Sequence, residues 1–149
     1  MPSSPTAPDA PLHPAKLTSL TPVQHRLSVI HTGAFFHLFN EGKQRELAHL
    51  IGTLLSPLSG SMILGSHMGV PDTDEYKNGG MRQSYLGLNI FGHSPTSWTR
   101  LWVGSDGIFK PQDVTVWVKV IEVERKIVGQ ASGDTKHKAH MLVWSVTRV

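Results

Sequence analysis

Residues 27–39, LSVIHTGAFFHLF, contain the features that decide the expected fold. The stretch begins as a short apolar strand at residues 27–30 and breaks at residues 31–33. It then becomes aromatic, and Asn40 gives a helix signal directly after it. A buried strand that ends in a glycine-containing loop and opens onto a helix is typical of the carboxyl edge of an open α/β sheet, where ligands bind. The stretch therefore predicts a ligand-binding edge, although a structural turn with a packed aromatic cluster would give the same pattern.

The segments that follow complete one strand–helix–strand unit. Residues 40–55 are predicted to form a helix because Asn40 is a good N-cap and Glu41 lies in the electropositive first turn. Residues 61–68 (SMILGSHM) predict a second buried strand, which should run parallel to the first with a right-handed crossover. The expected apolar face of the helix consists of Leu47, Leu50, Ile51, Leu54 and Leu55.

The remaining segments predict a second helix and an antiparallel strand pair. Residues 69–93 show no sustained period and are expected to form a long loop over the ligand side of the sheet. Ser94 and Pro95 open a short helix whose core face carries Trp98, Leu101 and Trp102. Residues 114–123 and 141–149 alternate with period two, which favours an antiparallel pair. The predicted fold class is α/β: strand, helix, strand, helix and a C-terminal antiparallel strand pair.

Composition bounds the class of protein. The 149 residues suit one domain, and 39% hydrophobic content is enough for a buried core. The absence of cysteine excludes disulfides and thiol catalysis, and it favours a cytoplasmic location. No apolar run approaches the ~20 residues that span a bilayer. The net charge of +3 is scattered along the chain, so neither a membrane nor a nucleic acid is expected as a partner.

The first 22 residues differ in composition from the rest. They hold six of the ten prolines and little that is apolar. Proline forbids regular helix and removes backbone donors, so residues 1–22 are expected to form a disordered tail. The folded domain is then expected over residues 23–149.

Nine histidines raise the question of a metal site. His137 and His140 lie three apart on a strand-like segment, so their side chains should point to opposite faces. No HExxH pattern occurs, and no metal ligands are assigned. The chain also has no GxSxG, P-loop or GxGxxG pattern.

Residues 29–69 carry a resemblance to a known family. The run VIHTGAFFHLFNEGKQRELAHLIGTLLSPLSGSMILGSHMG resembles the second half of class I S-adenosylmethionine-dependent methyltransferases, in particular the small-molecule enzymes of fungal terpenoid and meroterpenoid metabolism. The stretch HSPTSWTRLW at residues 93–102 is similar to the next helix of that family. The resemblance covers residues 23–149, and it implies the C-terminal portion of a partial Rossmann-like methyltransferase sheet that lacks the first three strands.

The resemblance also implies roles for residues near the expected ligand edge. His31 and His37 would be candidates for a general base in methyl transfer to a small hydroxyl or carboxyl group. S-adenosylmethionine would be the cofactor, bound near His31, Thr32, Gly33 and Phe36. The substrate would contact Phe35, Tyr76 and Tyr85.

The first half of such enzymes has no counterpart in this sequence. In the family that half supplies the glycine-rich loop, the acidic residue for the ribose and a polar residue for the adenine. The chain is therefore expected to be a truncated methyltransferase-like protein that is inactive alone. The alternative is a non-catalytic fragment or interaction module. It would pair with a methyltransferase partner, or with a second copy, through an open sheet edge.

Overall fold

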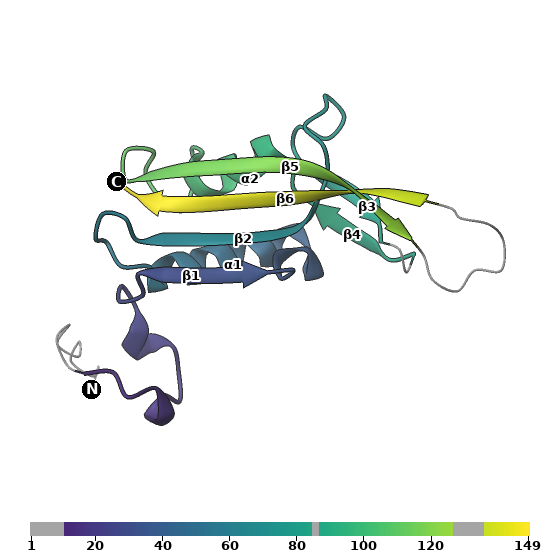
Figure 1. Cartoon of the computed structure of the whole chain (residues 1–149). Helices are drawn as coiled ribbons and strands as arrows, with labels where there is room; N and C mark the ends of the chain where they lie inside the picture. Colours follow the sequence, from purple (N-terminus) through teal and green to yellow (C-terminus); the bar gives the residue numbers. More distant parts are fainter. Residues whose placement is uncertain (1–10, 85–86, 127–135) are drawn as a thin grey trace.

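A computed structural model describes residues 11–84, 87–126 and 136–149 of the chain. Its main feature is a four-stranded mixed sheet in the order β1-β2-β6-β5, with helices α1 and α2 packed against it (Figure 1). The strands are β1 (Val29–Gly33), β2 (Met62–Gly69), β5 (Val114–Lys126) and β6 (Lys136–Arg148). The α/β class and the C-terminal antiparallel pair predicted from the sequence are confirmed. The arrangement is compatible with part of a Rossmann-like fold.

Strand β1, helix α1 (Glu41–Leu54) and β2 form the expected parallel unit, with Val29 opposite Met62 in the register. The sequence predicted that this strand breaks at His31, but the strand continues through Gly33. The ladder extends because Gly65 lets the neighbouring strand approach closely. A Cβ atom at position 65 would lie 2.1 Å from the carbonyl oxygen of Thr32. The chain turns only at Ala34, which has a φ of 51°.

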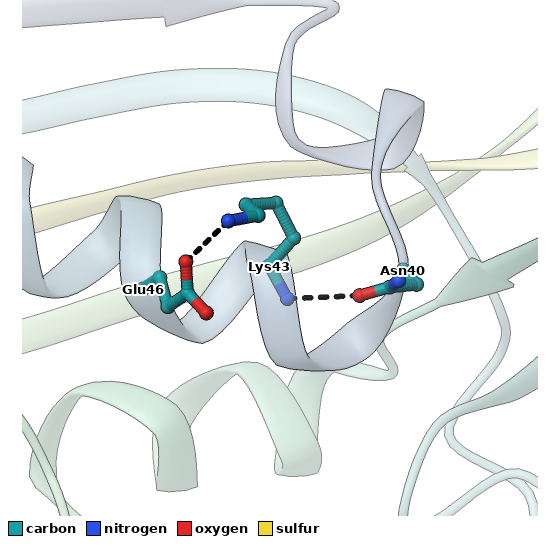
Figure 2. Close-up of polar contacts among 3 residues, drawn as sticks. All are labelled: Asn40, Lys43 and Glu46. Atoms are coloured by element: carbon teal, nitrogen blue, oxygen red, sulfur yellow. Dashed lines mark hydrogen bonds and ion pairs between the residues drawn. The ribbon is translucent and has the colours of Figure 1, made fainter.

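The start of α1 follows the sequence prediction closely. The Asn40 side-chain oxygen accepts a hydrogen bond from the backbone N–H of Lys43 at 2.9 Å, which satisfies one of the free donors of the first turn (Figure 2). The Lys43 ammonium also forms an exposed ion pair with Glu46 (Figure 2). Two separate interactions thus meet at one residue, one through its backbone and one through its side chain.

We expect Asn40→Ala to lower the free energy of unfolding by about 1 kcal/mol, because the Lys43 N–H loses its cap. Lys43→Ala is the matched control, since it keeps the capped N–H and removes only the exposed ion pair, which is worth no more than about 0.5 kcal/mol. Urea unfolding followed by circular dichroism measures both changes. Equal losses in the two variants would contradict the capping role.

The buried face of α1 differs in part from the predicted one. Ala48, Gly52 and Leu54 are buried, whereas Leu50 is 59% exposed. Gly52 is buried because Ile108 and Phe109 pack directly on the helix there, leaving no room for a Cβ atom. The contact of α1 with Ile108 and Phe109 is therefore made at a glycine, and a prediction based on large apolar side chains does not detect it.

Helix α2 (Pro95–Val103) begins with a capping box between Ser94 and Ser97. Its Trp98, Leu101 and Trp102 are all buried, as predicted. They join Ala48 of α1 in one core with β2, β6 and β5, so both helices cover the same face of the sheet. The buried strand residues of this core are Ile63, Val114, Leu142, Trp144 and Val146.

The opposite face of the sheet is not covered by any described segment. Large apolar side chains are exposed there: Val29 is 63% exposed, Trp117 53% and Ile121 41%. The outer edge of β1 also lacks a strand partner within the described residues. The sheet therefore has one packed face and one open face.

Two segments differ from a simple loop or tail. Residues 69–93, expected as a loop, contain a hairpin of β3 (Gly80–Gln83) and β4 (Asn89–Gly92). The part of the leader that the structure describes, from residue 11, contains the short 3-10 turns η1 (Pro14–Lys16) and η2 (Thr21–Val23). No helix in the described ranges has the length and apolar character needed to cross a membrane.

Candidate ligand-binding site

A cavity of about 830 Å³ lies at the carboxyl end of β2, beside the hairpin and the first part of β6. This volume is within the usual range of small-molecule sites, about 300–1,000 Å³. The position agrees with the expectation that the 69–93 segment lies over the ligand side of the sheet. The lining comes from the loop after β1 and η3 (Ala34, His37), from β2 and the turn after it (Ser66, His67, Met68, Gly69, Val70, Pro71, Tyr76), from the hairpin (Arg82, Gln83, Ser84, Gly87, Ile90) and from β6 (Lys138, Ala139, His140, Met141).

The structure brings two of the predicted site residues together. His37, in the 3-10 turn η3 (Phe36–Leu38), and Tyr76 both line the cavity. His31 is exposed on the open face of the sheet, where it pairs in register with Leu64. Phe36 is fully buried in the core. Of the other predicted residues, Thr32, Gly33 and Phe35 are not among the lining residues, and Tyr85 lies outside the described residues.

His67 is a cavity residue that the sequence analysis missed. It is only 2% exposed, and its ring packs against Phe36 and Trp98, with ring centroids 5.7 and 4.6 Å away. The indole Nε1–H of Trp144 donates a hydrogen bond to His67 Nδ1 at 3.1 Å. An indole N–H can only donate, so Nδ1 must be the acceptor nitrogen. The proton of the neutral ring then lies on Nε2, which is buried and has no hydrogen-bond partner within the described part of the chain.

Burial keeps His67 neutral. Loss of solvation lowers its pKa from 6.5 to about 3, and electrostatic interactions with His93, His37 and Arg82 add to that effect. His93 is also buried, and its Nδ1 lies 2.9 Å from the Ser97 hydroxyl. Burial, with a contribution from Arg45, lowers the pKa of His93 to about 4. At neutral pH the region thus holds two uncharged imidazoles.

The polar lining of the cavity favours a negative or electron-rich ligand. Arg82, Lys138 and three histidines contribute to the walls, while Asp and Glu are absent from the described lining. Glu122 lies beside this wall and forms an ion pair with Lys138 at 3.0 Å. The hydrogen bond from Lys138 lowers the pKa of the exposed Glu122 carboxyl. The arrangement can donate hydrogen bonds to an acceptor oxygen, and its described lining offers no carboxylate to a cation.

A positional signal for His67 was present in the sequence. It stands near the end of the second parallel strand, the same kind of position that drew attention to residues 31–33 after the first strand. Arg82 carried no such signal, because it lies in a stretch without periodicity. For metals, no cluster of three or more His, Asp or Glu side chains exists among residues 11–84, 87–126 and 136–149 where side chains are described.

The fold and the cavity together describe an α/β protein with a cavity of small-molecule size at the carboxyl end of a parallel strand. No family model matches the chain. The chain is 32% identical over 83 residues to the O-methyltransferase phiE of a fungal species (strain ATCC 74256). The match covers 56% of this chain and 26% of that protein, so the matched stretch spans about a quarter of the relative. It supports a relationship to methyltransferases.

Methyltransferases usually take S-adenosylmethionine as the methyl donor, so the fit of this molecule to the described residues can be tested by charge. S-adenosylmethionine carries a positive sulfonium, an ammonium group and a carboxylate, and its ribose offers hydroxyl donors. Arg82 and Lys138 suit the carboxylate, but the described lining of the cavity has no carboxylate to receive the two positive groups or the ribose hydroxyls. The described residues therefore do not fit the whole cofactor on their own.

Proposed function

We propose that the chain is the acceptor-binding, C-terminal portion of a class I S-adenosylmethionine-dependent methyltransferase domain. Its substrate would be a small molecule of the secondary-metabolite type. The observation that carries the proposal is the cavity at the carboxyl end of β2, in a chain with a partial match to a fungal O-methyltransferase. S-adenosylmethionine would supply the methyl group, through cofactor-binding groups beyond those described in this chain.

His37 is the described residue best placed to act as a general base. It lines the cavity and follows directly on the loop after β1. An imidazole within hydrogen-bond reach of an acceptor hydroxyl can take its proton as the oxygen is methylated, and such a base is worth about a hundredfold or more in rate. His31, on the open face, would not reach an acceptor in this cavity. Of the two predicted candidates, His31 and His37, we therefore assign the general-base role to His37 alone.

Calorimetric titration of the chain tests the proposal. We expect heat from small phenols and carboxylic acids, and none from S-adenosylmethionine up to about 1 mM, where binding would be worth only about 4 kcal/mol. We accordingly expect no labelled methyl transfer by the chain alone. Micromolar binding of S-adenosylmethionine would show that the chain holds the donor itself. Absence of heat from both classes of ligand would overturn the proposed function.

A non-catalytic interaction module is the second candidate, and the open face of the sheet favours it. Val29 at the outer strand and Trp117 on β5 are more than half exposed, and β1 has an unpaired edge within the described residues. Such an edge can pair with a strand of another chain. Light scattering during size-exclusion chromatography separates the candidates. A stable dimer without ligand binding supports the module, and a monomer that binds acceptors supports the methyltransferase portion.

A further inference from the structure

The Trp144–His67 pair fixes the direction of one hydrogen bond at the cavity. Because the Trp144 indole occupies Nδ1 at 3.1 Å, the neutral His67 ring can offer only a donor at Nε2. A histidine without such a partner could exchange its two tautomers and present either a donor or an acceptor. The two residues lie on neighbouring strands, β2 and β6, and both rings pack against Trp98, so these contacts hold the donor in place before any ligand arrives.

The Nε2–H group is buried without a partner among the described residues, and that is costly. An unsatisfied buried donor costs about 1–3 kcal/mol, so each one in a native protein calls for an explanation. The indole nitrogens of Trp98 and Trp102 are also buried without described partners, but these rings belong to the core and do not line the cavity. His67, in contrast, is one of the residues that line the cavity, where a ligand would sit.

The rest of the wall indicates what that ligand is like. Arg82 and Lys138 place cationic side chains on one side of the cavity, with Lys138 paired to Glu122, and Met68, Ile90 and Met141 give it an apolar side. A positive wall with an apolar floor suits an acidic oxygen on an apolar ring or chain. It disfavours a cation, which would meet the like charge of Arg82 and find no carboxylate among the described lining residues.

We propose that His67, oriented by Trp144, selects ligands that place an acceptor oxygen, such as a carboxylate or phenolate, against its Nε2–H. His67 is then a specificity-determining residue, and Trp144 is a positioning residue that acts through it. The inference rests on the proposed function only in naming the ligand as the methyl acceptor. The binding site itself is defined by the cavity and the two side chains.

The test uses two probes with the same ring system and opposite charge, naphthoate and naphthylmethylamine. We expect naphthoate to bind the unmodified chain and to shift the NMR signal of His67 Nε2 more than that of Nδ1. The amine should bind at least about tenfold more weakly. A chain that binds both equally, or that binds naphthoate without a change at His67 Nε2, would overturn the proposal, as would no binding of naphthoate at millimolar concentration.

Variants separate the donor from its positioning partner. His67→Phe keeps a ring but removes the donor, and it should weaken naphthoate binding by about ten- to a hundredfold. Trp144→Phe should leave a folded chain in which the imidazole nitrogens show a mixture of both tautomers, a change that loss of packing alone would not produce. His49→Phe and Trp117→Phe are the matched controls, because His49 and Trp117 are exposed and lie away from the cavity. His67→Gln, which retains an amide donor, serves if the Phe variant does not fold, and it should keep most of the affinity.

The outcome is separable from that of the proposed function because the probes are titrated without S-adenosylmethionine. Naphthoate binding through His67, in a chain that never supports methyl transfer with any cofactor-binding partner, keeps the selectivity and removes the methyltransferase assignment. If His67→Phe does not change the affinity for acceptors, the proposed selectivity of His67 is wrong, whereas the proposed methyltransferase function is unaffected.

Discussion

Replacing Trp98 with alanine should lower the free energy of unfolding by about 3–5 kcal/mol, a large part of the total stability of a domain of this size. Trp98 is fully buried, and its ring lies 5.0 Å from Phe36, 4.8 Å from Trp144 and 5.8 Å from Trp102, measured between centroids. It therefore holds α2 against β2 and β6 through one aromatic cluster. Truncation leaves a cavity that these rigid rings cannot close.

Trp117→Ala is the matched control, since it removes the same side chain from the open face of the sheet. Trp117 is 53% exposed, so we expect a loss well below that of Trp98→Ala and close to the small effect of a surface change. Urea denaturation followed by tryptophan fluorescence and circular dichroism measures both. A loss at Trp98 of less than about 1 kcal/mol would contradict the core assignment. Equal losses would show that the open face is covered in solution.

The elements that follow from local pattern were predictable. Trp98, Leu101 and Trp102 recur at helical spacing after a Ser-Pro start, and they are the buried face of α2. Asn40 is a side-chain cap whose partner lies three residues on, so the start of α1 could be placed correctly. The alternation of Leu142, Trp144 and Val146 likewise fixed the buried side of β6.

The features that depend on contacts between distant residues could not be predicted from local sequence pattern. The hairpin strands are four residues long, and their pairing depends on packing at Gly79, where a Cβ atom would lie 2.7 Å from the Phe91 ring. No local period reports such a contact. The turn after β1 was expected too early because the close approach at Gly65 comes from a strand far along the chain.

The candidate site likewise combines features that the local sequence pattern predicts with features that depend on distant contacts. The carboxyl end of the parallel strands was predicted from the pattern, and His37 and Tyr76 do line the cavity there. His67 gains its chemical character from Trp144, which is 77 residues away and becomes a neighbour only when β6 inserts beside β2. A sequence can mark the edge of a sheet where ligands bind, but the tautomer of a histidine at that edge is set by tertiary contacts.

Acidification should destabilise the chain by about 4 kcal/mol between pH 7.5 and pH 5, about 2 kcal/mol for each of His67 and His93. Both have folded-state pKa values below the unfolded value of 6.5, at about 3 and about 4, because burial penalises the charged ring. The unfolded chain therefore binds more protons than the folded chain in this range. The stabilising effect is complete above pH 6.5 and is lost as the pH falls toward the folded-state pKa values. Protonation of His67 would also place an N–H opposite the Trp144 N–H, which adds a direct repulsion.

Urea unfolding at several pH values measures this loss, and two variants assign it. His93→Asn keeps an oxygen that can accept from the Ser97 hydroxyl but cannot titrate, so it should halve the slope of stability against pH below 6.5. His49→Asn is the surface control, because it removes an exposed histidine of α1 and leaves both buried rings in place. Stability that stays level between pH 7.5 and pH 5 would contradict the burial of both rings as neutral groups. A slope that is reduced by His49→Asn but not by His93→Asn would place the titrating group on the surface, and the neutral donor at His67 would then need to be established by NMR alone.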